Sequence, residues 1–118
     1  MGMQEVFNDI LSMEGVKGLM LFSFAGDLVF KNLLQVGLAN VEDWDWRLFI
    51  ESLAGMREAD LIFDKGRLYI RRNDMGYLVL LIGPFVPIAM IRLQCDIVLP
   101  SLTPAKKTKG IRRFFKKS

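Results

Sequence analysis

The sequence of 118 residues contains no histidine and a single cysteine, Cys95. Without histidine the chain cannot form a Ser-His-Asp triad, a Cys-His nucleophile pair or an imidazole metal site. One cysteine excludes an internal disulfide and a zinc site with several cysteine ligands, so we interpret Cys95 as a small buried thiol. The phosphate-binding patterns GxxxxGK and GxGxxG are also missing from the sequence. These absences predict a protein that is not an enzyme and that has no catalytic residues, metal or cofactor.

Two groups of carboxylates could still be considered for acid–base chemistry: Glu42, Asp43 and Asp45, and the pair Asp60 and Asp64. General acid–base catalysis needs two carboxylates in unlike environments within one pocket. Spacing along the polar start of a helix creates no such environment, so we interpret these carboxylates as solvated caps.

A cluster of arginines follows in the sequence, at Arg67, Arg71 and Arg72. It indicates either a basic patch or a solvated strand face, and we favour the solvated face. An arginine finger offered to a partner GTPase is a further alternative, but nothing in the sequence singles one out.

Long apolar runs are missing too. The longest uncharged stretch, residues 75–91, is shorter than the roughly 20 residues that span a bilayer, and Pro84 and Pro87 interrupt it. The first 13 residues lack a basic region and contain Glu5 and Asp9, unlike a secretory signal. We therefore expect a cytoplasmic protein, with peripheral attachment to a membrane as an alternative.

The net charge of +3 is the sum of two unlike parts. Residues 1–104 carry 9 basic and 13 acidic side chains, a net charge of −4, whereas residues 105–118 carry seven basic side chains and no acid. This division predicts a domain over 1–104 and a disordered basic tail over 105–118. The tail residues that could bind an anionic partner are Lys106, Lys107, Lys109, Arg112, Arg113, Phe114, Phe115, Lys116 and Lys117.

Four interpretations of this tail stay open. Its charges would attract an anionic membrane surface, and its aromatic residues could enter the interface. The same composition suits an acidic protein partner, or single-stranded nucleic acid by stacking and phosphate contact. A solubilising tail with no dedicated ligand is the fourth interpretation. Of these, nucleic acid is the one that we favour least.

Hydrophobic residues make up 52% of the chain, and their spacing predicts a single α/β domain of the α+β type. The expected order is helix, two strands, helix, three strands, helix, at residues 3–13, 16–24, 28–34, 41–56, 59–64, 67–72, 77–82 and 87–102. The most apolar strands, 16–24 and 77–82, should lie in the middle of a five-stranded, mainly antiparallel sheet with helices on both faces. In strand 67–72, Leu68 and Ile70 alternate with Arg67, Tyr69 and Arg71, which predicts either one solvent-exposed face or an outer position in the sheet.

The predicted helix 41–56 has two apolar faces. At 100° per residue, Trp46, Phe49, Ile50, Leu53 and Met56 share one face, while Trp44 and Leu48 lie opposite. One face can pack on the sheet, so the other should contact a second partner.

The chain opens with Phe7-Asn8-Asp9-Ile10-Leu11, followed by Glu14-Gly15-Val16-Lys17-Gly18-Leu19. This opening resembles the roadblock/LC7 family, in particular its small single-domain members of the bacterial type. The segments 61–70 and 77–82 are similar to the last strands of that family. The resemblance covers about residues 3–102 and rests on order and pattern, because none of these segments is a catalytic motif. It implies a profilin-like fold with the sheet order 2-1-5-4-3.

The resemblance also implies a homodimer in which the third strand pairs with its copy and the second helix packs beside its copy. The residues agree with this, since strand 59–64 would be an apolar edge that needs cover. We therefore predict a dimer interface at Trp44, Leu48, Asp60, Leu61, Ile62 and Phe63. The alternative is that both tryptophans fill the core of a monomer.

As a function, the resemblance implies a non-enzymatic module that binds and regulates, or scaffolds, a small Ras-like GTPase or another NTPase. The alternative is a membrane-surface or nucleic-acid adaptor that acts through the basic aromatic tail.

Overall fold

The structure, a computed structural model, describes residues 3–34, 44–53, 55–64 and 66–102. The elements in chain order are α1 (Met3–Leu11), β1 (Val16–Phe22), β2 (Leu28–Leu33), α2 (Trp46–Ser52), β3 (Glu58–Phe63), β4 (Gly66–Asn73), β5 (Gly76–Ile82), α3 (Ile88–Val98) and a short 3₁₀ turn, η2 (Leu99–Ser101). The order of helices and strands is the predicted one.

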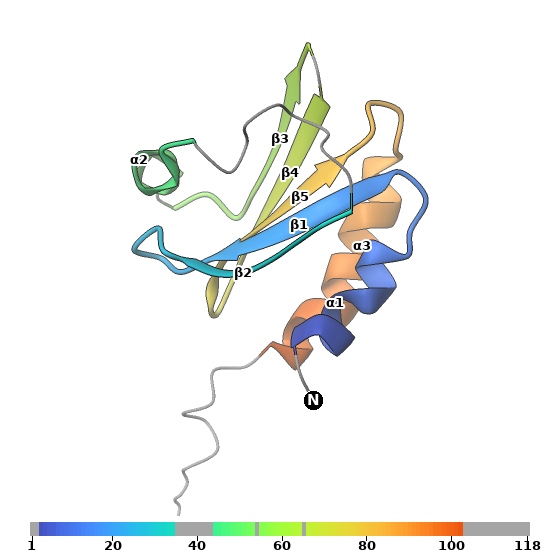
Figure 1. The fold of residues 1–118 in the computed structure, drawn as a ribbon, viewed down its shortest axis with the longest axis horizontal. Coiled ribbons are helices and arrows are strands. Elements are labelled where there is room, and N and C mark those ends of the chain that lie inside the picture. The colour runs from blue at the N-terminus through green and yellow to red at the C-terminus, as the bar shows by residue number, and fades with distance from the viewer. Residues whose placement is uncertain (1–2, 35–43, 54, 65, 103–118) are drawn as a thin grey trace, which may run out of the picture.

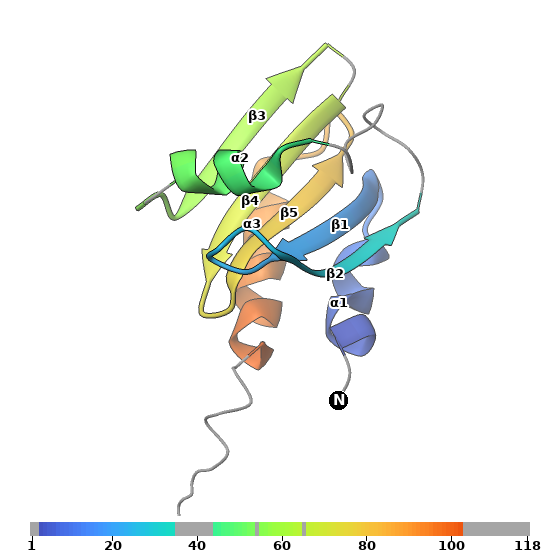
Figure 2. The same ribbon diagram turned by 60° about the vertical axis from the view of Figure 1, so that its left-hand side comes forward.

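The five strands form one antiparallel sheet in the order β2-β1-β5-β4-β3, as predicted. Helix α2 lies over one face of this sheet, and α1 and α3 lie side by side on the other (Figures 1 and 2). Strands β2 and β3 are the two edges.

The core is divided into two apolar clusters by the sheet. Along β1, Leu19 and Leu21 pack toward α1 and α3, while Met20 and Phe22 pack toward α2. All seven residues of β5 are buried, which confirms the prediction that its uninterrupted apolar run is a central strand.

The prediction of a solvent-exposed face on β4 is wrong. Tyr69 and Arg67 are buried on the face toward α3, and Leu68 and Ile70 are buried on the face toward α2. Because helices cover both faces of the sheet, a strand one position from the edge has no wet side. The alternation here separates two buried faces: the face toward α3, where the polar side chains have hydrogen-bonding partners, and the purely apolar face toward α2.

Helix α2 is shorter than predicted. It begins at Trp46, so Trp44 precedes the helix, and the turn at Gly55, with a positive φ of 83°, leaves Met56 beyond its end. Residues 41–43, where the helix was expected to begin, lie outside the described residues. Trp44, which was expected on the second face of the helix, therefore lies in the segment that leads into the helix.

The predicted boundary at 104 and the basic tail over 105–118 lie outside the described residues. The division into domain and tail therefore stays a prediction. Within the described part of the chain, no helix is long and apolar enough to cross a membrane.

Candidate interaction surface

Strand β3 has a backbone edge that no described residue of the chain pairs with. The amide of Arg72 donates to the carbonyl of Arg57 over 2.9 Å. Together with the register of the two strands, this bond determines which residues of β3 are hydrogen-bonded to β4. In an antiparallel pair, every second residue directs its N–H and C=O to the partner strand and the others direct theirs away. The backbone groups of Glu58, Asp60 and Ile62 therefore point outward and can accept another strand.

The side chains of β3 alternate between the two faces of the sheet. Leu61 packs against the α2-side cluster, and Phe63 contacts Trp44 on that side. Ile62, on the opposite face, is 72% exposed. An open edge that carries exposed apolar side chains favours association with another strand.

Helix α2 is held over the sheet by its start and by one buried side. The Asp45 carboxylate accepts a hydrogen bond from the Leu48 amide over 3.1 Å, so it caps the helix. This confirms the cap interpretation for Asp45, while Glu42 and Asp43 lie outside the described residues. Trp46 and Ile50 are buried beneath the helix, and Leu48, on the outward side, is 63% exposed.

The turn between β1 and β2 contacts the first turn of α2. A Cβ built on Gly26, whose φ is 92°, would lie 2.7 Å from the Cα of Arg47. Only glycine permits this close approach. The Arg47 guanidinium also donates to the Asp27 carboxylate over 2.6 Å, although both side chains are largely exposed. The close backbone approach therefore holds the first turn of α2 against the β1–β2 turn.

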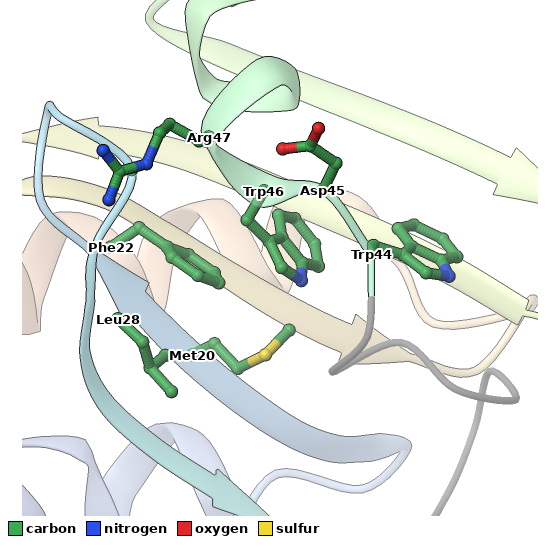
Figure 3. A pocket seen from close by; sticks show the side chains of 8 residues that line it. Met20, Phe22, Leu28, Trp44, Asp45, Trp46 and Arg47 are labelled. Carbon is green, nitrogen blue, oxygen red and sulfur yellow. The ribbon is translucent and has the colours of Figure 1, made fainter.

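A row of aromatic rings joins α2 to β3. Trp46 stacks on Phe22 at 4.7 Å between ring centroids, and Trp44 stacks on Trp46 at 5.6 Å. Trp44 then meets Phe63 edge-on, also at 5.6 Å. The two tryptophans, with Met20 and Phe22, line a cavity of about 320 Å³ beside the first turn of α2 (Figure 3).

Trp44 therefore has partners within its own chain. It is half-buried and joins the exposed edge of the sheet to the core, whereas Leu48 projects into solvent. The structure brings Trp44, Leu61 and Phe63 to the α2 side and leaves Asp60 and Ile62 on the other. The predicted interface residues thus surround the open edge on both faces, and their role in a dimer stays a prediction.

Asp60 is bound to Arg67 by two hydrogen bonds, from Nε and from one Nη, each 2.8 Å long. The other Nη of Arg67 donates to the carbonyl oxygens of Pro84 and Val86 at 3.2 and 2.9 Å. Arg67 is buried, so the expected solvated arginine face is wrong here. This arginine is fully paired and ties the edge strand to the loop between β5 and α3.

The other two arginines of the cluster also have partners. Arg71 forms an ion pair with Asp96 of α3, and the guanidinium of Arg72 lies over the ring of Phe24 at 5.3 Å. These contacts hold α3 and the β1–β2 turn against β4. They give the arginines structural roles in the fold.

A second polar group links β3 to α3. Glu58 accepts hydrogen bonds from Arg92 and from the Tyr69 hydroxyl. The Arg92 hydrogen bond, followed by that of Tyr69, lowers the pKa of Glu58. Burial, followed by the bond to Glu58, raises the pKa of Tyr69 to about 12. The edge strand is thus anchored to α3 through Glu58, and to the loop between β5 and α3 through Asp60 and Arg67.

Acidification should weaken the Asp60–Arg67 pair. The hydrogen bonds from Arg67 lower the pKa of Asp60 below 3.8, its ordinary value. Folding therefore favours the ionised carboxylate, and its contribution is present above about pH 4 and is lost as the pH falls through the lowered pKa. We expect Asp60→Asn to lower the free energy of unfolding at pH 7 by about 1 to 2 kcal/mol, because the carboxylate is only partly exposed. Urea titrations at pH 7 and pH 3 measure both values.

The matched control for that change is Asp27→Asn. Asp27 also pairs with an arginine, but its pair is exposed on both sides, so the loss should stay within about 0.5 kcal/mol. Equal losses for the two variants at pH 7, or an undiminished loss for Asp60→Asn at pH 3, would contradict this account of Arg67.

Neither a metal site nor a reactive thiol is found in the described part of the chain. No group of three or more carboxylate or cysteine side chains could hold a metal ion there. Cys95 is buried, as expected, and burial raises the pKa of its thiol to about 11. The tail residues proposed for an anionic partner, Lys106 to Lys117, lie outside the described residues.

One exposed apolar group was missed from the sequence. Met90, Leu93 and Ile97 project from the outer side of α3. Their spacing of three and four residues is visible in the sequence, but the buried side of the same helix already accounted for its apolar pattern.

No protein-family model matches the chain, and no curated protein matches it in sequence. Two solved structures, both of roadblock/LC7 domains from Streptomyces avermitilis, match its fold. One has a TM-score of 0.64 at 15% identity, covering 86% of this chain and 99% of the other. The second has a TM-score of 0.66 at 12% identity, covering 99% of this chain and all of the other. The fold is that of a roadblock/LC7 domain.

Proposed function

We propose that this chain is a non-enzymatic interaction module that forms a homodimer through β3 and α2. The observation that carries the proposal is the open edge of β3, whose outward backbone groups at Glu58, Asp60 and Ile62 adjoin exposed apolar side chains. A second β3, antiparallel about a two-fold axis, would satisfy these groups and extend the sheet across both subunits.

Helix α2 supports the same arrangement. Its outward Leu48 would lie against the copy of α2 once the two edge strands pair, because both elements border the same edge. The Trp44–Phe63 contact holds the end of β3 and the start of α2 together. Pairing of the strands and packing of the helices are therefore parts of one interface.

As its partner we propose a small Ras-like GTPase or another NTPase, which the dimer regulates or scaffolds. This step rests on the likeness of fold to roadblock/LC7 domains and on the absence of catalytic motifs from the sequence. The extended sheet would supply a broad two-fold surface for such a partner.

Affinity capture from native lysate, in the presence of GDP or a GTP analogue, tests the choice of partner. We expect a Ras-like GTPase, identified by mass spectrometry, to be recovered preferentially in one nucleotide state. A bait carrying Ile62→Pro, designed to block the β3 edge, is the matched control and should recover less of it. Recovery of no NTPase in either nucleotide state would contradict the proposal of partner and leave the dimer to be tested separately.

A further inference from the structure

The outer side of α3 carries an apolar stripe that no described residue covers. Met90, Leu93 and Ile97 are 57%, 62% and 61% exposed, and at 100° per residue they share one side of the helix. Ala89 and Pro100 are exposed beside them, and the charged side chain nearest to this side on α3, Asp96, is paired with Arg71. Three large apolar side chains in a row on one helix indicate an interaction surface.

The stripe continues into a hollow at the start of α3. This hollow has a volume of about 550 Å³ and is lined mainly by apolar residues, among them Met13, Val86 and Met90. Phe85, at its rim, is 93% exposed. The stripe and the hollow form one apolar surface along the whole length of α3, which we call the α3 surface.

On its α1 side the α3 surface borders acidic side chains, whereas Arg57, Arg71 and Arg72 lie beside the C-terminal end of α3. Helix α1 lies beside α3 (Figure 2) and contains Glu5 and Asp9 but no basic residue, and Glu14 follows it at the hollow. Arg92, the one basic residue of α3, is bound to Glu58. An anionic lipid surface would be repelled by these carboxylates, whereas a segment with basic and apolar side chains would be attracted.

The chain carries such a segment directly after α3. Residues 105–118 hold seven basic side chains and no acid, and they include Ile111, Phe114 and Phe115. These three are spaced i, i+3 and i+4 in the sequence, a pattern that would place them on one side of a helix. Segment and surface are thus complementary in both charge and hydrophobicity.

The segment is also long enough to reach the whole α3 surface. The described chain ends at Leu102, next to the C-terminal end of α3. The 11 residues of α3 span about 17 Å, whereas the 12 residues from Leu102 to Phe114 can extend to about 40 Å. A tether of this length holds the segment at an effective concentration in the millimolar range.

We propose that the α3 surface is a docking site for the chain's own C-terminal segment, with Ile111, Phe114 and Phe115 on the apolar stripe and the flanking lysines and arginines near the acids of α1. Docking covers the apolar stripe in water and withholds the basic aromatic segment from other anionic ligands. This inference does not depend on the dimer or on the GTPase.

A spin label at the end of the full chain tests the proposal. The buried Cys95 thiol has its pKa raised by burial, so a nitroxide reagent should modify Ser118→Cys selectively. We expect the methyl NMR signals of Met90, Leu93 and Ile97 to lose most of their intensity, and to recover it when the nitroxide is reduced. The methyl signals of Leu48, across the sheet on α2, should keep theirs.

Two variants separate docking from general proximity. Phe114→Ser with Phe115→Ser, which keeps every charge of the segment, should restore the α3 signals. Leu48→Gln, an equally exposed apolar residue on the other face, should leave the broadening of the α3 signals unchanged. Equal broadening at Leu48 and at α3, or broadening that survives loss of both phenylalanines, would overturn the proposal.

A mixed sample identifies the source of the segment. Spin-labelled chains without NMR isotopes are mixed with isotope-labelled chains that carry no spin label. Broadening of the α3 signals in this mixture, as strong as in the single labelled chain, would show that another copy docks and would overturn docking of the chain's own segment. Unbroadened α3 signals in the labelled chain, with its segment bound to phosphatidylserine vesicles, would make a membrane the ligand and would also overturn it.

Discussion

Replacing Ile62 by proline is expected to turn a dimer into a monomer with the same fold. The Ile62 amide points away from β4, so proline removes no hydrogen bond within the chain's own sheet. It does remove a donor from the outer edge, and its ring obstructs an approaching strand. Light scattering should report twice the 13.5 kDa chain mass for the parent and a single chain mass for the variant.

The size of this effect follows from symmetry. A net loss of about 1 kcal/mol for each backbone hydrogen bond counts twice across a two-fold axis. With the steric obstruction included, the dissociation constant of the dimer should rise by about 100-fold or more. The far-ultraviolet circular dichroism spectrum of the variant should match that of the parent.

Lys31→Pro is the matched control on the other edge of the sheet. The amide of Leu34 donates to Lys17, and the register of β1 with β2 then directs the backbone of Lys31 outward as well. A proline there should leave the mass at two chains. If Lys31→Pro dissociates the dimer and Ile62→Pro does not, the interface lies on β2 and the assignment to β3 is wrong.

Truncating Trp46 to alanine should cause the largest loss of stability. The indole is buried and stacks between Phe22 and Trp44, where it joins α2 to β1. Removing a buried tryptophan costs about 3 to 5 kcal/mol, because the transfer free energy is lost and a cavity remains. Urea unfolding measures the change, at a fixed chain concentration because the proposed dimerisation would add to the apparent stability.

Trp44→Ala is the comparison for that change. Trp44 is only half-buried and contacts the core through Trp46 and Phe63. Its truncation should therefore cost about half as much as that of Trp46, or less, in proportion to the smaller apolar area withdrawn from water. A loss for Trp44 as large as for Trp46 would contradict the account of Trp46 as the main contact between α2 and the sheet.

Much of the fold could be predicted because its strongest signals are local. The uninterrupted apolar runs of β1 and β5 mark buried central strands, and the helical spacing in α1 and α3 marks their buried sides. The strand order came from the resemblance to roadblock/LC7 domains, since hydrophobic patterns do not determine which strands are neighbours. Leu48 was identified correctly as an outward-facing residue, because the helical period alone places it opposite the buried side chains of α2.

The environment of the polar residues could not be predicted in the same way. Arg67 and Tyr69 resemble solvent-facing strand residues in sequence, yet both are buried with partners from distant segments. Asp60, Pro84 and Val86 supply the acceptors for Arg67, and no local pattern brings these together. Burial of a charge depends on tertiary partners, so the sequence pattern indicates only that a polar group is present.

The position of Trp44 was missed for a related reason. The predicted helix was extended to residue 41 by its apolar and acidic residues, but the Asp45 carboxylate caps the helix at Trp46. A cap four residues later places Trp44 on the approach to the helix, where it meets Phe63. Because the helix is capped at Asp45, and not near residue 41, the Trp44 side chain contacts Phe63 and does not lie on the outer face of the helix.

Amide hydrogen exchange along β3 tests the central claim most directly. In a dimer paired through β3, the outward amides of Glu58, Asp60 and Ile62 are hydrogen-bonded to the second subunit and should exchange slowly, the more so as protein concentration rises. The outward amide of Leu33, on the opposite edge, should exchange rapidly at every concentration. Exchange at Glu58, Asp60 and Ile62 that is as fast as at Leu33, and independent of concentration, would contradict the proposed interface.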